Sequence, residues 1–454
     1  MARLFTSEGA SGRAMTELSC EAVMRIGRAL ALLLQNRSGR PAKIVIGRDT
    51  RVSGEILTVS FAAGCCSAGA DAHILGVVPT PAVSYLAEKY SADAGVMITA
   101  SHNTYEFNGL RIFDGYGYSL SLELLSEIER LVTEAPEEMQ IAGGEQIGRI
   151  IYEKNAEWDY VRWLIKQIDA DLSRMRVVID CANGAACGTA EKFFRGIGAS
   201  VTLINNIPDG KNINLDCGTL NLESLQRCVI EYRAHVGLAF DGDAGRCMMV
   251  DEKGQVLDGD RLTALLAYAM KNSQKLNANT CVVSQTTNLG FFRWAKENGI
   301  VVSAVPEVGI RYIVERMLLG DYNLGGSSAG HIILLNSSKT ADGELAGAKI
   351  LEILSRSGRK MSELASVYEP YPQVTLNIPL RPEYAGRWQD NPAVAEIITF
   401  CQQKLEGDGR VSVRESTASP LLRITAEGRD KDTVWQYAQA IAKTVRDNVG
   451  YPEE

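Results

Sequence analysis

The stretch Gly95-Val96-Met97-Ile98-Thr99-Ala100-Ser101-His102-Asn103 joins an apolar run to a serine–histidine pair. A short apolar run of this kind predicts a buried β-strand, which places the pair at the carboxyl end of that strand. Open α/β sheets present their ligand-binding loops at that edge. The pattern therefore indicates a nucleophilic serine, Ser101, beside an acid–base group, His102. A structural alternative stays open, in which Ser101 caps a helix and His102 lies on the surface.

Strand-like and helix-like stretches alternate along most of the chain, which indicates the α/β fold class. A helix is expected over residues 55–66. Strands are expected at residues 43–46, 73–78, 176–180, 235–240, 280–284 and 373–379. The 454 residues are too many for one core, because single cores stop growing at about 250–300 residues, so several domains are expected. Linkers are expected at residues 136–148, 251–254 and 368–372.

The composition argues against several classes of function. A net charge of −8 and the lack of a basic stripe with interleaved aromatic residues argue against a nucleic-acid partner. No apolar segment approaches the ~20 residues of a membrane span, and the stretch Met1-Ala2-Arg3-Leu4-Phe5 does not lead into the apolar core of a signal peptide. We therefore expect a cytoplasmic protein without a membrane partner. The ten cysteines form no C-x-x-C pair, which favours dispersed thiols over a zinc or redox site.

Two carboxylates follow the apolar run 235–240. Asp241 and Asp243 flank a glycine, and such a pair can converge on one hard cation, for which Mg²⁺ is the suitable candidate. The alternative is ordinary turn chemistry. A second copy of the tripeptide, Asp258-Gly259-Asp260, stands before a helix-like run and indicates a helix N-cap. The first copy, which leads to Arg246, is therefore the better metal candidate.

Two later loops carry groups suited to sugars and phosphates. The glycine-rich stretch that ends in His331 offers backbone N–H groups and an imidazole to sugar hydroxyls or a phosphate, although a plain hairpin turn explains the pattern too. The hydroxyl-rich stretch 414–419 begins with Arg414 and is followed by Arg423, and guanidinium groups with hydroxyls suit a phosphate. The alternative is a solvated loop with an ion pair at Glu415.

These loops occur in the order nucleophile, carboxylate, glycine-rich and phosphate-type, one in each apparent domain. Together they resemble the α-D-phosphohexomutase family, most closely its bacterial phosphoglucosamine mutase branch, over essentially the whole chain. The stretches that carry the resemblance are Gly47-Arg48-Asp49-Thr50-Arg51-Val52-Ser53-Gly54, Val77-Val78-Pro79-Thr80-Pro81, residues 99–109, Asp180-Cys181-Ala182-Asn183-Gly184-Ala185-Ala186, residues 209–214, residues 239–244, Tyr322-Asn323-Leu324-Gly325-Gly326 and Tyr371-Pro372-Gln373-Val374.

The resemblance implies an α/β fold with three similar mixed α/β domains and a smaller C-terminal α+β domain around a central cleft. The implied domains are a nucleophile (phosphoserine) domain at 1–150, a metal-loop domain at 151–253, a sugar-loop domain at 254–367 and a phosphate-binding domain at 368–454. It also implies the conversion of glucosamine 6-phosphate to glucosamine 1-phosphate through a phosphoserine and a bisphosphate intermediate. In that reaction Mg²⁺ bridges the phosphoserine and three aspartates.

Residue by residue, the resemblance assigns roles within these loops. The implied catalytic residues are Ser101, His102, Arg111 and Arg246. The implied metal ligands are Ser101, Asp241 and Asp243. The implied substrate-binding residues are Ser327, His331, Arg414, Ser416 and Arg423. A hexose phosphate or bisphosphate is the implied small-molecule partner.

Every functional loop also departs from the family pattern. Arg111 stands where the family has a lysine near the transferred proton, and an arginine is a poor proton shuttle because its pKa exceeds about 12. Gly245 occupies the third aspartate position, which should weaken Mg²⁺ binding. The other departures are Ser11 for an arginine, Thr104 for a proline, Ile310 for an aspartate, Ser327 for a glutamate, Ala329 for a serine, Thr417 for a glycine and Ala418 for a threonine.

These substitutions lead to competing hypotheses. The first is a phosphohexomutase-family protein of weak or altered activity. The second is a catalytically silent paralogue that binds a phosphosugar or regulates a partner protein, as a homodimer or in a complex with an active mutase. A serine phosphatase or hydrolase built on Ser101 and His102 is a third hypothesis, which no further sequence feature favours.

Overall fold

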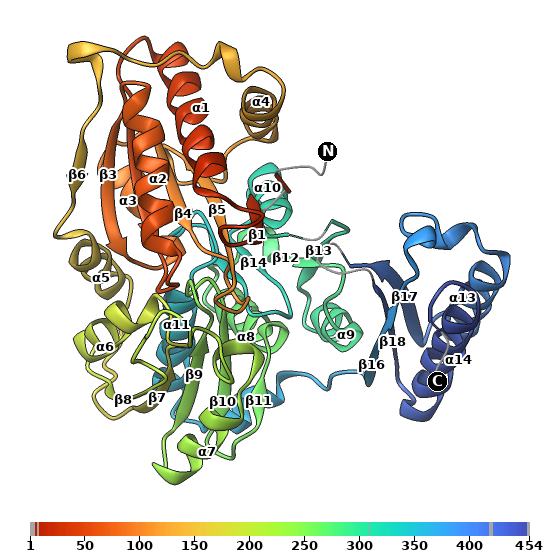
Figure 1. The fold of residues 1–454 in the computed structure, drawn as a ribbon. Helices are drawn as coiled ribbons and strands as arrows, with labels where there is room; N and C mark the ends of the chain where they lie inside the picture. The colour runs from red at the N-terminus through yellow and green to blue at the C-terminus, as the bar shows by residue number, and fades with distance from the viewer. Residues whose placement is uncertain (1–4, 7–8, 308, 417–420, 452–454) are drawn as a thin grey trace. The chain divides into compact units, whose positions relative to one another are not determined.

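A computed structural model describes residues 5–6, 9–307, 309–416 and 421–451 of the chain (Figure 1). The chain divides into two compact units, of which the first comprises residues 1–286 and 298–367 and the second residues 287–297 and 368–454. The described residues form four sheets, three in the first unit and one in the second. Helices accompany every sheet, which confirms the predicted α/β fold class with a smaller C-terminal α+β part.

The first sheet carries the Ser101 loop. Its strands are β1 (Ala10–Arg13), β2 (Lys43–Arg48), β3 (Asp71–Val77), β4 (Ala94–Ile98), β5 (Phe107–Asp114) and β6 (Ile150–Tyr152), in the order β1-β5-β4-β2-β3-β6. Its helices are α1 (Cys20–Ser38), α2 (Gly54–Ser67), α3 (Thr80–Lys89) and α4 (Leu122–Thr133).

The two faces of this sheet are covered by different helices. Ile44 and Ile46 of β2 pack in one apolar core with side chains of α1, α2 and α4. Successive residues of a strand point to opposite faces, so Gly47 faces the other side of the sheet from Ile46. There it lies against Val83 of α3. The neighbouring strand β4 is buried along its whole length, and it delivers the next loop residues, including Ser101, directly to the end of the sheet.

The second sheet carries the Asp241 loop. Its strands are β7 (Arg176–Asp180), β8 (Ser200–Ile204), β9 (Val236–Phe240), β10 (Cys247–Asp251) and β11 (Val256–Leu257), in the order β11-β10-β9-β7-β8. The helices α5 (Ala156–Lys166), α6 (Ala186–Gly196) and α7 (Glu223–Glu231) belong to this stretch. The all-apolar β9 is fully buried and ends at Phe240, so the two aspartates leave the sheet at its carboxyl edge. Residues 251–254, expected as a linker, instead form the turn between β10 and β11.

The third sheet carries the glycine-rich loop. Its strands are β12 (Thr280–Ser284), β13 (Val301–Val305), β14 (Leu324–Gly326) and β15 (Ile332–Leu334), in the order β13-β12-β14-β15. Its helices are α8 (Gly259–Asn272), α10 (Ile310–Leu319), α11 (Gly343–Ser357) and α12 (Met361–Leu364). Asp258 caps α8 by accepting the backbone N–H of Arg261, which confirms the N-cap predicted for the second Asp-Gly-Asp copy.

The second unit is an antiparallel sheet packed with helices. Its strands β16 (Gln373–Pro379), β17 (Gly409–Glu415) and β18 (Leu421–Gly428) are ordered β16-β18-β17, and its helices are α9 (Leu289–Glu297), α13 (Pro392–Leu405) and α14 (Lys431–Asn448). Helix α9 comes from the stretch expected to form the sugar-loop domain. It belongs to this unit because Glu427 accepts the backbone N–H of Leu289 at 2.7 Å and the Phe291 ring meets Tyr368 edge-on.

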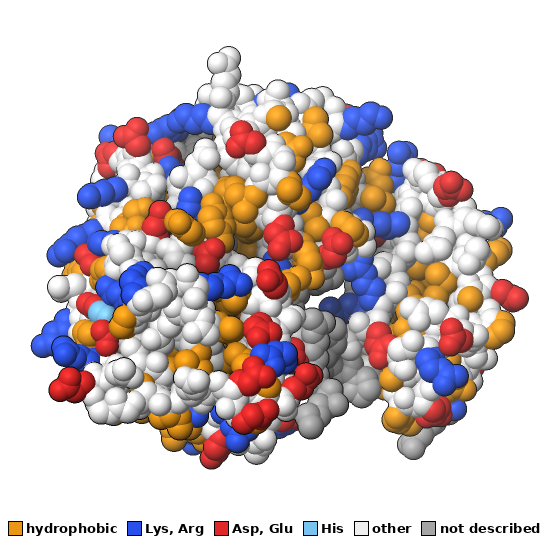
Figure 2. Space-filling model, turned by 90° about the horizontal axis from the view of Figure 1, so that it is seen from above, with side chains coloured by type: hydrophobic (Ala, Val, Ile, Leu, Met, Phe, Trp, Pro, Cys, Tyr) orange, Lys and Arg blue, Asp and Glu red, His pale blue; other side chains and the backbone are white. Residues whose placement is uncertain are grey.

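On the face drawn in Figure 2, the described side chains show no grouping of charge that singles out a binding site. On the face in Figure 2, acidic and basic side chains are intermixed and hydrophobic side chains lie among them. No helix within the described ranges is both long enough and apolar enough to span a bilayer.

Candidate active site

Ser101 lies in the turn between β4 and β5 and does not start a helix, so the helix-cap alternative is wrong. Its backbone adopts φ = 51°, a left-handed conformation that non-glycine residues rarely take. Its Oγ donates a hydrogen bond to Oδ2 of Asp241 at 2.6 Å, and its backbone N–H donates to Oγ1 of Thr99 at 2.9 Å. The structure therefore brings the predicted nucleophile onto the first carboxylate of the predicted metal loop.

Asp241 and Asp243 are both fully buried. Oδ1 of Asp241 accepts the backbone N–H of Arg246 at 3.0 Å, and Oδ2 of Asp243 accepts the hydroxyl of Thr80 at 2.6 Å. Burial, with the charge of Asp243 beside it, raises the pKa of Asp241 to about 7. Burial also acts to raise the pKa of Asp243, but the Arg111 guanidinium and the Thr80 hydroxyl outweigh it and hold that pKa below its usual value. The pair thus shares one low-dielectric pocket.

Two guanidinium groups face these carboxylates. Nη1 of Arg111 lies 3.7 Å from Oδ2 of Asp243, and Nε of Arg246 lies 3.7 Å from Oδ2 of Asp241. At these distances the positive charges compensate the buried carboxylates without a direct hydrogen bond between the paired atoms. The predicted catalytic arginines are therefore part of the same polar cluster as the predicted metal ligands.

The donor set suits Mg²⁺ in its chemistry, although it is small. Within the described residues no group of three His, Cys, Asp or Glu side chains is arranged to hold a metal. Mg²⁺ is nevertheless commonly held by one or two carboxylates together with phosphate oxygens and water. Asp241, Asp243 and an oxygen on Ser101 supply such a set. At Gly245 an added Cβ would lie 3.4 Å from Oδ1 of Asp243 with no backbone atom in its way, so the position of the expected third aspartate is sterically open.

Arg246 connects two histidines. Its Nη2 lies 2.7 Å from Nδ1 of His102, and its Nε donates to Nε2 of His331 at 3.2 Å. Because a guanidinium can only donate, both of those ring nitrogens are unprotonated. Burial and the positive charge of Arg246 lower the pKa of His102 to about 4 and the pKa of His331 well below its usual value. Both imidazoles are therefore neutral, with the proton on Nε2 of His102 and on Nδ1 of His331.

The glycine-rich stretch is a hairpin turn between β14 and β15, as its structural alternative predicted. The backbone N–H of Ser327 donates to the carbonyl of His331 at 3.0 Å, and the N–H of Cys247 donates to the carbonyl of Gly330 at 2.9 Å. The turn thus lies against the segment that carries Arg246. The Ser327 hydroxyl is buried and has no hydrogen-bond partner among the described residues, so this hydroxyl is available to a ligand or to water.

The residues predicted to bind phosphate lie on a hairpin of the second unit. Arg414 of β17 and Arg423 of β18 stand directly opposite each other in the ladder, and the N–H of Ser416 donates to the carbonyl of Leu421 at 2.9 Å. Like charges in directly opposed positions destabilise a sheet, and here each guanidinium has a neutral partner. Nε of Arg414 donates to the Ser412 hydroxyl, and Nε of Arg423 donates to Oδ1 of Asn377, both at 3.2 Å. The substitutions noted at Thr417 and Ala418 lie outside the described residues.

The remaining departures fall at defined places in the fold. Ser11 lies on β1 opposite Gly109, Ile310 is the first residue of α10, and Ala329 lies in the β14–β15 turn. The carbonyl of Thr104 accepts a hydrogen bond from the buried Arg51.

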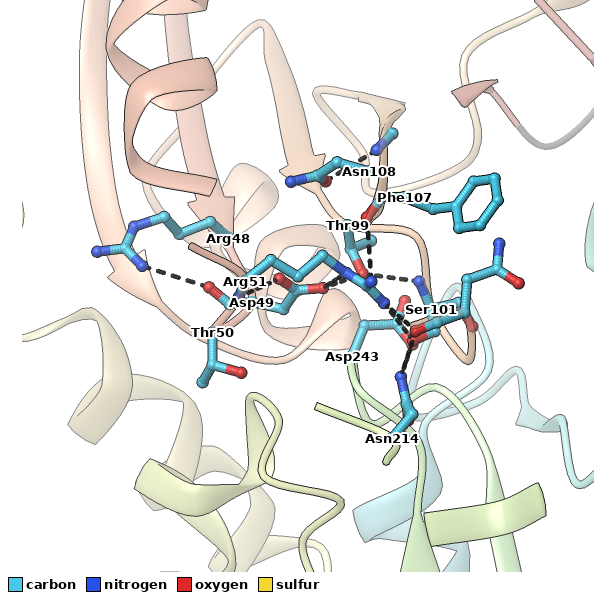
Figure 3. A network of polar contacts seen from close by, with 12 residues as sticks. Arg48, Asp49, Thr50, Arg51, Thr99, Ser101, Phe107, Asn108, Asn214 and Asp243 are labelled. Atoms are coloured by element: carbon cyan, nitrogen blue, oxygen red, sulfur yellow. Dashed lines mark hydrogen bonds and ion pairs between the residues drawn. The ribbon is translucent and has the colours of Figure 1, made fainter. Parts of the chain in front are cut away.

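Several polar residues that contact the site were not assigned to it from the sequence, and Arg51 is among them. Arg51 is hydrogen-bonded to Asp49, which in turn accepts the Thr99 hydroxyl (Figure 3). The Thr80 hydroxyl donates to Oδ2 of Asp243. The sequence feature that could have pointed to them is the charged stretch 49–51, which follows β2. Charges at the carboxyl end of a buried strand need polar partners there. Their partners are distant in the sequence, so the pattern alone does not reveal them.

Four sequence profiles of the phosphoglucomutase/phosphomannomutase family match consecutive parts of the chain. Alpha/beta/alpha domain I matches residues 2–139, domain II residues 159–254, domain III residues 258–371 and the C-terminal domain residues 376–444. The chain therefore belongs to this family, the α-D-phosphohexomutases.

Within the family the chain is phosphoglucosamine mutase-like. It is 42% identical to the phosphoglucosamine mutase of Acetivibrio thermocellus over 450 residues, which are 99% of this chain and 100% of that protein. It is 40% identical to the phosphoglucosamine mutase of Clostridioides difficile over 449 residues, again 99% of this chain and 100% of that protein.

Solved structures share the fold at low sequence identity. A phosphoglucomutase/phosphomannomutase family protein from Burkholderia thailandensis has a TM-score of 0.81 at 20% identity, covering 98% of this chain and 97% of its own. An N-acetylphosphoglucosamine mutase from Aspergillus fumigatus, solved with GlcNAc-6P and magnesium, has a TM-score of 0.62 at 18% identity and covers 81% of this chain and 92% of its own.

Proposed function

We propose that this chain interconverts glucosamine 6-phosphate and glucosamine 1-phosphate through a phosphoryl group carried on Ser101, with a lower turnover than a complete site would give. The observation that carries this proposal is the 2.6 Å contact between Oγ of Ser101 and Oδ2 of Asp241 inside a buried cluster of carboxylates, guanidinium groups and neutral imidazoles. The 40–42% identity to phosphoglucosamine mutases supports the choice of substrate class.

The reaction consists of two phosphoryl transfers. In the first, phosphoserine 101 loses its phosphoryl group to the free hydroxyl of the sugar phosphate, which gives a hexose 1,6-bisphosphate and the serine hydroxyl. In the second, the turned-over bisphosphate returns its other phosphoryl group to Ser101 and leaves as the isomeric monophosphate. Phosphate and protons balance over the cycle, and the enzyme regains its starting state.

The residues of the site act on charge and orientation. Nε of Arg246 lies 3.7 Å from Oδ2 of Asp241, the same oxygen that accepts the Ser101 hydroxyl, and Nη2 of Arg246 holds Nδ1 of His102 at 2.7 Å. In the proposed reaction Arg246 and the Nε2–H of His102 donate hydrogen bonds to phosphoryl oxygens, which stabilises the charge spread over them during transfer. Asp241 orients the serine oxygen. Asp241, Asp243 and the phosphoserine would hold Mg²⁺, which when bound neutralises charge on the transferring phosphoryl group.

In this arrangement neither Arg111 nor the two histidines of the site are well suited to accept the proton of the attacking hydroxyl. The sugar hydroxyl must lose its proton as it attacks, and Arg111 cannot accept that proton because it stays protonated at any physiological pH. The nitrogens of His102 and His331 that could accept it are already hydrogen-bonded to Arg246. Together with Gly245 in place of a third carboxylate, this supports a lowered turnover.

The test measures phosphate on Ser101 and conversion of substrate in the same sample. We expect a hexose 1,6-bisphosphate carrying labelled phosphate to label the protein at Ser101, Ser101→Ala to take no label, and glucosamine 6-phosphate to convert slowly. A sample that takes no label and converts none of several hexose phosphates overturns the proposal. Ligand-induced thermal stabilisation without turnover would favour a silent binding protein, and steady phosphate release from simple esters would favour a hydrolase.

The same proposal includes the cell compartment and the binding partners of the protein. All ten cysteines are free thiols, which supports a reducing compartment such as the cytoplasm. The small-molecule partner is a hexose phosphate or bisphosphate, and a homodimer or a complex with an active mutase is tested by the mass of the protein in solution.

A further inference from the structure

Arg51 is a buried arginine whose donors are used almost entirely by the Ser101 loop. The residue is 1% exposed. Nη2 donates to the carbonyls of Ser101 at 3.0 Å and Asn103 at 2.8 Å, and Nη1 donates to the carbonyls of Thr104 and of Phe107, the latter at 3.0 Å (Figure 3). A guanidinium has five N–H donors. Four of these donors therefore bind backbone carbonyls within residues 101–107.

The fifth donor fixes the arginine itself. Nε of Arg51 donates to Oδ2 of Asp49 at 2.9 Å, and Oδ1 of Asp49 accepts the backbone N–H of Arg51 at 3.0 Å. Oδ2 of Asp49 also accepts the Thr99 hydroxyl at 2.6 Å, and that hydroxyl oxygen accepts the N–H of Ser101 at 2.9 Å. The Asp49–Arg51 pair thus reaches the backbone of Ser101 from both sides, through Thr99 at its N–H and directly at its carbonyl.

A second contact comes from the loop that follows β8. Nδ2 of Asn214 donates to the carbonyls of Ser101 and Asn103, both at 2.9 Å. These are the same two carbonyls that Nη2 of Arg51 binds. The segment 101–103 is therefore held between an arginine in the loop after β2 and an asparagine in the loop after β8.

This double support acts where the backbone is strained. At φ = 51° Ser101 has a conformation that it would leave unless the surrounding bonds fixed it. A rotation of this residue would carry Oγ away from Oδ2 of Asp241, which lies only 2.6 Å away. The bonds to its N–H and carbonyl oppose that rotation, whereas none of them involves Oγ itself.

We propose that Arg51 is a positioning residue, which with Asn214 holds Ser101 in the left-handed conformation needed for phosphoryl transfer. This inference rests on the function proposed above. The hydrogen bonds of Arg51 to this loop go to backbone carbonyls and not to Oγ of Ser101, so it acts through the backbone and not on the phosphoryl group. A misplacement of about 1 Å at a reacting atom can cost about 100-fold in rate, so the role predicts a loss of transfer rate and not of substrate affinity.

The experiment compares Arg51→Lys and Asn214→Asp with the wild type in the full chain. Lysine keeps the charge beside Asp49 but cannot bind four carbonyls, and aspartate keeps the shape of Asn214 but turns a carboxylate toward two carbonyls. We expect hydrogen exchange at residues 99–108 to increase in both variants. The rate of phosphate uptake by Ser101 from glucose 1,6-bisphosphate should fall about 30–100-fold, while KM for the bisphosphate changes less than about threefold.

A matched control is Arg410→Lys, because Arg410 is also paired with a buried carboxylate, that of Glu427 at 2.7 Å, but in the second unit. This variant should leave exchange at residues 99–108 unchanged. If Arg51→Lys does not fold, Asn214→Asp alone decides, since it removes a partly exposed contact of the same loop.

Wild-type exchange and transfer rates in both variants would overturn the inference, and so would a change confined to KM. This experiment distinguishes a failure of the positioning role from a failure of the proposed function. If the wild type takes up no phosphate, the proposed function fails, while the exchange at residues 99–108 still decides whether Arg51 and Asn214 hold the loop.

Discussion

Replacing Gly245 with aspartate should strengthen Mg²⁺ binding at the proposed metal site. The φ angle of Gly245 is outside the left-handed region, and the nearest atom to an added Cβ is Oδ1 of Asp243 at 3.4 Å, an ordinary contact. A Cβ at this position therefore fits without moving the backbone, and the carboxylate it carries would extend from the same loop that holds Asp241 and Asp243.

The magnitude follows from the charges around this position. Two unit charges about 4 Å apart interact by about 4 kcal/mol at an effective dielectric constant of about 20. Arg111 and Arg246, each 3.7 Å from one of the existing carboxylates, offset part of that repulsion. We therefore expect metal-free Gly245→Asp to be less stable than the wild type by about 1–3 kcal/mol. With Mg²⁺ bound, the variant should instead be more stable than the wild type, because a divalent cation attracts the third carboxylate more strongly than the other two carboxylates repel it.

The assay is a titration with Mn²⁺ or Mg²⁺, followed by calorimetry and by the change in melting temperature. A gain of about 10–100-fold in affinity is expected, equivalent to about 1.4–2.7 kcal/mol. Gly245→Asn is the control, since it has the same shape without the charge. Equal metal affinities for the aspartate and asparagine variants would refute the reasoning, as would a destabilisation that added metal does not reverse.

Three further outcomes are expected. Arg111→Lys should raise kcat several-fold with little change in KM, because a lysine near Asp243 can exchange a proton; unchanged kcat in steady-state assays would contradict the proposed weakness in proton transfer. Burial, followed by the charge of Asp342, raises the pKa of Glu344 well above its ordinary value, so this group stays protonated when folded and ionises when unfolded. Its contribution to stability is therefore lost as the pH rises above about 4.5. Glu344→Gln should gain stability relative to the wild type between about pH 5 and pH 8. A difference in melting temperature between the two proteins that does not change with pH would contradict this. Phe240→Ala should cost about 3–5 kcal/mol in urea unfolding, since the Phe240 ring is fully buried against Phe194, and a cost below about 1 kcal/mol would show that the site collapses to fill the space.

The elements of the fold were largely readable from local patterns. The strands predicted at 176–180, 280–284 and 373–379 coincide with β7, β12 and β16, because each is a run of strand-forming residues bounded by residues that favour turns. The cap at Asp258 was also predictable, since the bond to the N–H of Arg261 joins residues three apart. Local chemistry is enough for such features.

The site was readable only in part. Ser101 and Asp241 each follow an apolar strand, which marked them as candidates, but the 2.6 Å contact between them joins residues 140 positions apart. Arg51 shows the limit more clearly. A charged residue after a strand is normally expected at the surface, and this one is buried because its carbonyl partners arrive from residues 50–56 positions away. No periodicity or spacing encodes such a meeting.

Helix α9 has a consequence for how this chain can be divided. The C-terminal unit takes residues 287–297 from the middle of the chain, so it is not a terminal module that a stop codon could remove cleanly. A polypeptide ending at residue 367 would retain α9 but lose Tyr368 and Glu427, leaving Phe291 and Trp294 without the aromatic ring they pack on. Shuffling of C-terminal halves between relatives would meet the same obstacle, because the incoming half must match a helix encoded some 70 codons earlier.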